Sequence, residues 1–355
     1  MKTKYLFAIL FLLTSTLLFG CNAEKKINTN EVNETTTPSE RLKIFTTVYP
    51  LQDFTEKIGG EHVEVKSVFP IGADAHTFEP TTKTMVEIAE ADALLYIGAG
   101  VEGFITAASK AMNNEKVQLV KTTEGMKLAK AEREEPHYDE DEDEAERQED
   151  HSNESHSHDA HEDESETEHS SHNEHEEHHH HGDVDPHVWL DPVLSIELAE
   201  NVLHTLEQLK PEAKDDFERN FKELRASLLE LDKDFQDLVN QSPKKKILVS
   251  HSAYGYWESR YGIQQLSVSG LSPSNEPTQK ALKNIINTAN KYNIKFVIFD
   301  QNLSSKAAEV VKNELNAESL TLHNLESITA ADDANGADYF SIMKQNLDTL
   351  RKALN

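Results

Sequence analysis

The sequence predicts an α/β protein of two lobes, each a mainly parallel sheet flanked by helices, joined by one long bridging helix. Three observations support this fold class. Apolar, β-prone runs alternate with helical segments in residues 42–97, the same alternation returns in residues 246–322, and a purely helical stretch separates them. Strands that alternate with helices favour a parallel sheet. The 355 residues and their 37% apolar content suffice for cores of ordinary size in both lobes.

The N-terminal lobe is expected to cover residues 42–193. Its predicted elements are, in order, strand 42–48, helix 51–58, strand 62–69, helix 84–91 and strand 93–97. The last of these reads ALLYI, and such a continuous apolar run is typical of a strand buried on both faces. A turn-like Pro-Ile-Gly-Ala-Asp segment follows the second strand.

The C-terminal lobe is expected to cover residues 242–355 and to repeat this order. Its predicted elements are strand 246–250, helix 278–292, strand 294–299, helix 305–315 and strand 319–322.

A linking helical segment is predicted at residues 194–241, with a break at Pro211. Beyond that break, large apolar side chains recur at spacings of three or four, which indicates a core-facing helical stripe: Phe217, Phe221, Leu224, Leu228, Leu231 and Phe235. A single helix over residues 213–239 would be roughly 40 Å long. We expect it to bridge the lobes and to limit their hinge motion.

The N-terminus has the order of an export signal. Lys2 and Lys4 precede an apolar run that is too short to span a bilayer, so residues 1–20 are predicted to be a signal peptide. The Gly-Cys that ends it resembles a bacterial lipobox, which predicts lipidation of Cys21; a plain secretory signal is the alternative. Residues 21–41 would then be a flexible tether. Cys21 is the only cysteine, so no disulfide can form within the chain.

Residues 132–182 are rich in Glu, Asp, His and Ser and almost free of large apolar side chains, so we expect a disordered loop. Twelve of the 18 histidines lie there, and histidine-rich tracts are typical of weak metal collection. The alternative is an acidic solubilising insert. The residues expected to collect metal are His175, His178, His179, His180 and His181.

The formal net charge of −29 argues against a nucleic-acid-binding function, because tracking phosphates requires clustered Lys and Arg. We expect cations or cationic surfaces as partners.

Three of the remaining histidines lie at the edges of predicted elements, where loops present functional groups. His76 follows a strand, His187 lies in a turn between two prolines, and His251 ends an apolar strand. His62 and His204 are interpreted as surface residues. A solitary loop histidine is more often solvated than metal-bound, so each of the three is weak evidence when taken alone.

Four segments together resemble the zinc and manganese receptors of bacterial ABC importers, a family of extracytoplasmic solute-binding lipoproteins. They are AHTFEP at 75–80, DPHVWLDP at 185–192, SHSAYGYW at 250–257 and GLSPSNEPT at 270–278. The resemblance covers nearly all of the chain from residue 42 onward. The histidine-rich acidic insert is itself a feature of the zinc-selective members.

The resemblance implies that His76, His187 and His251 are metal ligands. It places a carboxylate or a water in the fourth position, for which Glu326 is favoured and His323, Asp300 or a water are alternatives. The family more often has Pro-Leu-Glu-Gly where this chain has Asn-Leu-Glu-Ser at 324–327. Three imidazoles with one carboxylate favour Zn²⁺ over Mn²⁺, which prefers more oxygen ligands.

The expected function is high-affinity capture of zinc as a transported ligand, on the extracytoplasmic face of the cell membrane. The implied partners are an ABC permease with its ATPase subunit, and the membrane through the lipid anchor; a monomer is expected. A manganese receptor and a surface adhesin lipoprotein are the alternatives. A zinc hydrolase is disfavoured, because the sequence has no GxSxG motif and its HExxH match, HEEHH at residues 175–179, lies in the low-complexity histidine-rich stretch and not in a predicted helix.

Overall fold

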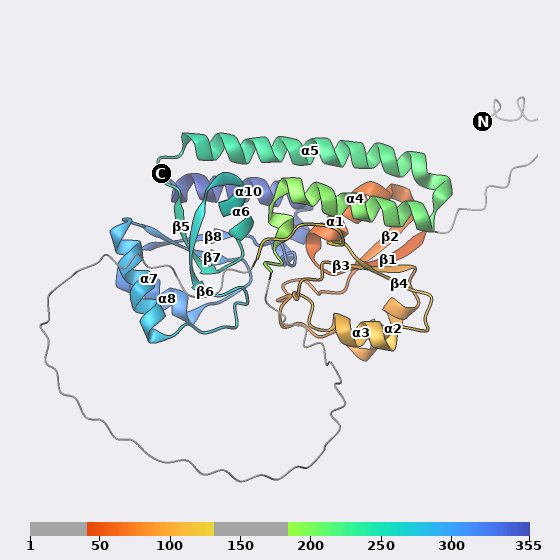
Figure 1. The fold of residues 1–355 in the computed structure, drawn as a ribbon, viewed down its shortest axis with the longest axis horizontal. Coiled ribbons are helices and arrows are strands. Elements are labelled where there is room, and N and C mark those ends of the chain that lie inside the picture. Colours follow the sequence, from red (N-terminus) through yellow and green to blue (C-terminus); the bar gives the residue numbers. More distant parts are fainter. Residues whose placement is uncertain (1–40, 131–183) are drawn as a thin grey trace, which may run out of the picture. The chain divides into compact units, whose positions relative to one another are not determined.

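The computed structural model describes residues 41–130 and 184–355, which form two four-stranded sheets (Figure 1). The strand order is β2-β1-β3-β4 in the first sheet and β6-β5-β7-β8 in the second, so the two sheets repeat one topology. Every pairing between these strands is parallel. The predicted fold class is confirmed.

The first lobe holds the elements β1 (Leu42–Thr46), α1 (Tyr49–Gly59), η1 (Gly60–His62), β2 (Val63–Ser67), α2 (Thr82–Ala89), β3 (Ala93–Tyr96), α3 (Ile105–Ala111) and β4 (Gln118–Lys121). Helix α1 includes Pro50, which fits the first turn of a helix because no backbone N–H is needed there. The prediction for His62 was wrong in part. This residue lies in the short turn η1, not in the strand, and is half-buried against α5.

The connecting segment holds η2 (Val188–Leu190), α4 (Pro192–Leu209), η3 (Pro211–Ala213) and α5 (Lys214–Gln241). The break predicted at Pro211 is confirmed, since α4 ends two residues before it. The second lobe follows with β5 (Lys246–His251), α6 (Gly255–Tyr261), β6 (Gln264–Ser269), α7 (Gln279–Lys291), β7 (Phe296–Asp300), α8 (Lys306–Leu315), β8 (Glu318–Leu322), α9 (Ala330–Ala334) and α10 (Tyr339–Ala353).

Two helices of the second lobe begin one residue later than predicted because the predicted first residue is an N-cap. The Thr278 hydroxyl accepts a hydrogen bond from the backbone N–H of Ala281 at 3.1 Å, and Ser305 caps Ala308 in the same way. Such caps satisfy backbone donors that have no partner within the helix.

Helix α5 bridges the two lobes, as predicted, and runs along both in Figure 1. Near its start, Phe217 contacts the His62 ring, with a centroid distance of 5.5 Å. Near its end, Phe235 stacks on Tyr261 at 5.1 Å and contacts Trp257 at 5.3 Å. The helix also packs against α1, α4, α6 and α10. Each end of α5 is therefore fixed to a different lobe.

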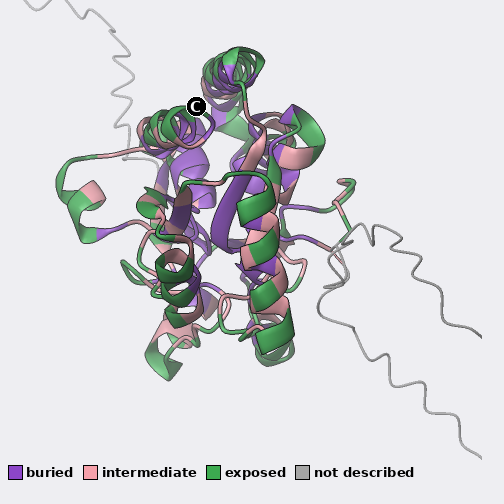
Figure 2. Cartoon of the chain, turned by 90° about the vertical axis from the view of Figure 1, so that its left-hand side faces the viewer, coloured by how far each residue is buried: buried purple, intermediate pink, exposed green. Residues whose placement is uncertain are grey.

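The main hydrophobic core is continuous from one lobe to the other. It includes the strands of the first sheet, the inner faces of α4 and α5, and Trp257 and Tyr339 of the second lobe. A smaller cluster packs α7 and α8 on the second sheet. Figure 2 shows the buried interior and the exposed outer faces of the helices. Within the described ranges, no helix combines the length and the apolar character that crossing a membrane requires.

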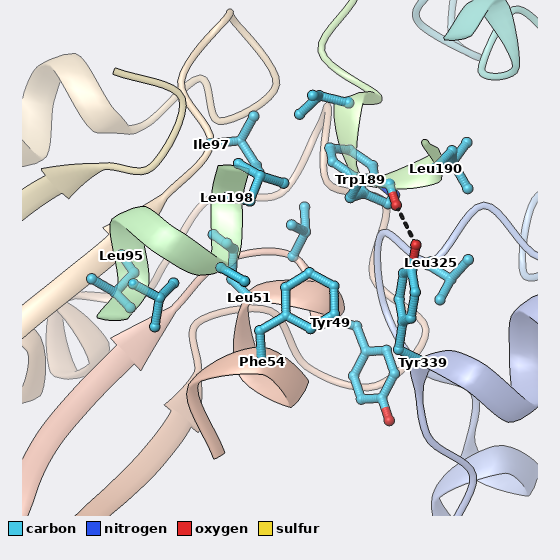
Figure 3. Packing of buried hydrophobic residues seen from close by; sticks show 14 of the residues in the cluster. Tyr49, Leu51, Phe54, Leu95, Ile97, Trp189, Leu190, Leu198, Leu325 and Tyr339 are labelled. Carbon is cyan, nitrogen blue, oxygen red and sulfur yellow. Dashed lines mark hydrogen bonds between the residues drawn. The ribbon is translucent and has the colours of Figure 1, made fainter. Parts of the chain in front are cut away.

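The link between the lobes can be followed at Trp189 (Figure 3). Its backbone carbonyl accepts a hydrogen bond from the Tyr339 hydroxyl at 2.8 Å, and its indole N–H donates to the carbonyl of Asn324 at 2.7 Å. Trp257 donates in turn to the carbonyl of Leu190 at 2.7 Å. The segment that carries His187 is therefore tied to the second lobe through backbone and indole groups.

Because Phe235 anchors the end of α5, truncating this residue should lower the stability of the protein more than truncating an exposed residue of the same helix. Phe235→Ala should lower the free energy of unfolding by about 3–5 kcal/mol, because it removes a fully buried ring. Leu229→Ala is the matched control; that side chain is 40% exposed, and the change should stay within about 0.5 kcal/mol. Urea unfolding followed by circular dichroism measures both, and equal losses would show that α5 is not anchored at Phe235.

Candidate metal centre

Three imidazole rings and one carboxylate, far apart in sequence, converge at a single point. The residues are His76, His187, His251 and Glu326, and one ligand atom from each lies within 4.8 Å of the others. Nε2 of His76 is 3.4 Å from Nε2 of His187, and Oε1 of Glu326 is 3.5 Å from both. Nε2 of His251 is 3.9 Å from the same oxygen.

Three of these distances match the edges of a tetrahedron around a small divalent ion, and Nε2 of His251 lies farther from Glu326. With bonds of about 2.0–2.1 Å to imidazole nitrogen, neighbouring ligand atoms in a tetrahedral site are roughly 3.4 Å apart. Three of the four distances are within about 0.1 Å of that value. The Nε2 atom of His251 is buried and has no hydrogen-bond partner, as expected for a nitrogen whose lone pair is reserved for an ion.

The four residues come from both lobes and sit beside the carboxyl ends of the sheets. His76 lies in the loop after β2, and His187 directly precedes η2. His251 ends β5, and Glu326 follows β8. In the second sheet, β5 and β7 are the neighbours at which the strand order reverses, and such a switch point is the usual ligand crevice of an open parallel sheet.

The corresponding switch point of the first sheet, between β1 and β3, is closed by a buried carboxyl group. Glu102 accepts hydrogen bonds from the Thr47 hydroxyl at 2.7 Å and from the backbone N–H groups of Ile97 and Gly98 at 2.8 and 3.0 Å. Burial raises the pKa of Glu102 to about 7, against the lowering effect of these donors. The first lobe therefore contributes to the centre through loops, not through the tips of its central strands.

Two aspartates orient two of the rings. Nδ1 of His187 lies 2.8 Å from Asp185, and Nδ1 of His251 lies 2.7 Å from Asp300. Because an ionised carboxylate can only accept, each Nδ1 carries a proton, and Nε2 is the nitrogen that offers a lone pair to the centre when the ring is neutral. Carboxylate partners of this kind fix the tautomer of metal-binding histidines.

A glycine makes room for one of these aspartates. A Cβ atom at Gly255 would lie 2.6 Å from Oδ2 of Asp185, closer than two such atoms can approach. The glycine of the SAYGYW segment therefore permits Asp185 to stand behind His187.

The centre is almost sealed from solvent. The exposed fractions of the His187, His251 and Glu326 side chains are 0%, 1% and 2%, and that of His76 is 9%. Burial lowers the pKa of His187, but its contacts with Asp185 and Glu326 raise it more strongly, to about 9. Burial likewise opposes ionisation of Glu326, yet the contacts with His187 and His76 keep its pKa well below the usual range.

The turn that presents Glu326 has an unusual backbone. Leu325 has a φ of 60°, in the left-handed region that β-carbon-bearing residues seldom adopt. Its N–H donates to Nδ1 of His323 at 2.9 Å, which stabilises this conformation. Strained backbone of this kind concentrates at functional sites, where the surrounding contacts enforce it.

The other residues considered from sequence lie outside the cluster. Asp300, an alternative fourth ligand, stands behind His251 and faces its Nδ1. His323, the other protein alternative, points Nε2 toward Asp332 at 3.4 Å. His204 is exposed, as expected. Outside the described residues lie the predicted signal peptide and tether, Cys21, and the loop with His175, His178, His179, His180 and His181.

The sequence did not reveal the aspartates that orient the rings. Asp185 lies two residues before His187, and this close spacing is the one signal that could have indicated its role. Asp300 is 49 residues from His251 and meets it only because β5 and β7 are neighbours in the sheet.

The family model described as "Zinc-uptake complex component A periplasmic" matches residues 44–353. The zinc-binding protein AdcA of Streptococcus pyogenes serotype M3 is 33% identical over 311 residues, which are 88% of this chain but 56% of that protein. The chain thus spans about half the length of the AdcA relatives that it matches.

A second relative is matched over nearly its full length. The high-affinity zinc uptake system protein ZnuA of Bacillus subtilis (strain 168) is 31% identical, with 89% of this chain and 88% of that protein covered. Among solved structures, the Zn(II)-bound ZnuA-like domain of Streptococcus pneumoniae AdcA is 27% identical with a TM-score of 0.66, covering 88% of this chain and 99% of that one.

The electrostatics of the centre predict a pH dependence of the metal-free protein. The pKa of His187 is higher in the folded state than in the unfolded state, so protonation of this ring stabilises the fold. The stabilisation is fully present at pH values below the unfolded-state pKa of about 6.5, and it is lost as the pH rises through about 9. In the presence of a chelator, the free energy of unfolding should therefore fall by about 3 kcal/mol between pH 6.5 and 9.5.

The variant His187→Gln should lack this fall, and His204→Gln, which changes an exposed histidine, should keep it. Urea midpoints measured at half-unit pH steps decide the matter. The same slope in all three proteins would show that the buried imidazole is not the group that titrates.

Proposed function

Because the chain belongs to the family of zinc-uptake complex component A, we propose that it captures one Zn²⁺ ion between its lobes and delivers the ion to a membrane ABC permease. The single observation that carries the proposal is the convergence of four buried donor atoms from the two lobes on one point. The proposed partners are the permease and its ATPase subunit, and the receptor is proposed to act as a monomer.

The proposed ligands are Nε2 of His76, His187 and His251 and Oε1 of Glu326. This set of three nitrogens and one oxygen suits zinc, which accepts imidazole readily in tetrahedral geometry. Manganese prefers a larger shell in which oxygen dominates. The distances of 3.4–3.5 Å among the donor atoms of His76, His187 and Glu326 support the smaller shell and therefore favour zinc as cargo.

The same geometry favours capture over catalysis. A hydrolytic zinc site keeps one position open for the water that it activates, whereas a site with four protein ligands is closed. In the proposed site four protein side chains would supply all corners of the tetrahedron, and three of them are at most 2% exposed. We therefore expect no turnover of esters or peptides.

Capture requires the loss of a proton. With a pKa of about 9, His187 is protonated in the metal-free protein at neutral pH, and the ion must displace that proton. The proton stabilises buried Glu326 until the ion takes its place. Acidification should consequently weaken capture, and a docked permease that separates the ligand loops would release the ion by the same exchange.

Two further parts of the proposal concern residues outside the described ranges. Lipidation of Cys21 would keep the receptor at the extracytoplasmic face of the membrane. The histidines of residues 132–182 would collect zinc weakly and raise its concentration near the buried centre.

Calorimetric titration of the mature protein with Zn²⁺ tests the proposal. We expect one tight site that disappears in the triple variant His76→Ala, His187→Ala, His251→Ala, leaving weak binding alone. His76→Ala by itself should weaken the tight site roughly 100-fold, since 10–16 kcal/mol of zinc binding is shared among four ligands.

The matched control is the double variant His62→Ala, His204→Ala, which removes two histidines that lie away from the cluster and should leave the tight site unchanged. Tight binding that survives in the triple variant would contradict the site. Hydrolysis of model esters or peptides by the zinc-loaded protein would contradict the assignment of a receptor.

A further inference from the structure

The side chain of Asn324 lies against the oxygen of Glu326 that faces the three imidazoles. Its amide Nδ2 donates a hydrogen bond to Oε1 of Glu326 at 2.9 Å. Its Oδ1 accepts from the backbone N–H of Glu326 at 3.2 Å. Asn324 is 4% exposed, and its backbone carbonyl is fixed by the indole of Trp189. The amide is therefore a buried, anchored donor to a ligand atom.

The two contacts determine the orientation of the amide. If nitrogen and oxygen were exchanged, the amide oxygen would face the carboxylate oxygen of Glu326, and the amide hydrogens would face the backbone N–H of the same residue. Both pairs would repel each other. The donor of Asn324 must accordingly point to Oε1.

The other oxygen of Glu326 is turned away from the imidazoles. Oε2 accepts from the backbone N–H of Ala75 at 3.3 Å, whereas Oε1 lies 3.5–3.9 Å from Nε2 of all three rings. Ala75 precedes His76 in the loop of the first lobe. With one oxygen bound to Asn324 and the other to Ala75, the carboxylate plane cannot rotate freely.

We propose that Asn324 is a positioning residue that restricts Glu326 to coordination through one oxygen and so makes the centre selective for zinc over manganese. This inference rests on the proposed function. A carboxylate that offers one oxygen completes a four-ligand shell, which zinc prefers. A carboxylate free to turn could offer both oxygens, and the larger, oxygen-richer shell would favour manganese.

Two variants remove the donor in different ways. Asn324→Ala deletes the amide, and Asn324→Asp keeps the size and the oxygen that accepts from the Glu326 N–H while replacing the donor by an acceptor. The matched control is Asn346→Asp. That buried asparagine binds the backbone N–H and carbonyl of His323 at 2.8 Å each, so it supports the same segment through His323 and not through Glu326.

The affinities of all four proteins for Zn²⁺ and Mn²⁺ are measured by competition against a chromophoric chelator. Loss of the donor should raise the zinc Kd by roughly 10- to 100-fold, as removal of a partner of a ligand typically does. The manganese Kd should rise by a smaller factor, so that the zinc-to-manganese preference falls. Asn346→Asp should leave that preference unchanged.

Visible absorption of the Co²⁺-loaded proteins gives a readout that a purely structural role would not move. Four-coordinate Co²⁺ absorbs strongly in the visible range, and five- or six-coordinate Co²⁺ absorbs weakly. The wild type and Asn346→Asp should show the strong bands, and both Asn324 variants should show weaker ones.

The inference is overturned if the affinities for Zn²⁺ and Mn²⁺ fall by the same factor, or if neither affinity changes. It is also overturned if Asn346→Asp shifts the zinc-to-manganese preference as much as the Asn324 variants do. Failure of the proposed function is a separate outcome, because the wild type itself would then lack the tight zinc site. Should Asn324→Ala fail to fold, Asn324→Asp is compared with the wild type and with Asn346→Asp in the same way.

Discussion

The arrangement of the metal centre depends on one buried carboxylate, that of Glu326, whose negative charge needs a cation. Glu326 is 2% exposed and is surrounded by three imidazoles, so its negative charge requires a positive partner. In the metal-free protein, the proton on His187 provides that partner, and a divalent ion can replace it with greater charge at the same point. Several features maintain this arrangement. They are the aspartates behind His187 and His251, the glycine beside Asp185, and the strained turn at Leu325.

The connection between the lobes suggests how far the centre can open. One hydrophobic core runs through both lobes, α5 is anchored to each of them, and the two tryptophans bond the backbone across their junction. A wide rotation would have to break this core, whereas loops such as the one that carries His76 could move locally. Small movements of ligand loops therefore suit this architecture better than the closure of two independent domains.

Much of this fold could be predicted from the sequence because its strands are apolar runs and its caps and prolines are informative. Five short elements with weak patterns were missed, namely α3, β4, α6, β6 and α9, and so was the longer helix α10. His76, His187 and His251 could be singled out by their positions at element edges, and Glu326 only through resemblance to a family. The pairing of Asp300 with His251 could not be predicted, because it depends on which strands are neighbours. The role of Asn324 depends on a side-chain orientation that sequence does not contain.

A crystal structure of the zinc-loaded protein, with the ion located by anomalous scattering at the zinc edge, tests the central claim most directly. The account predicts one fully occupied ion bound by Nε2 of His76, His187 and His251 and by a single oxygen of Glu326, with bonds of about 2.0–2.1 Å. A zinc ion bound elsewhere in the folded lobes, or at this point with water in place of two or more of these side chains, would contradict it.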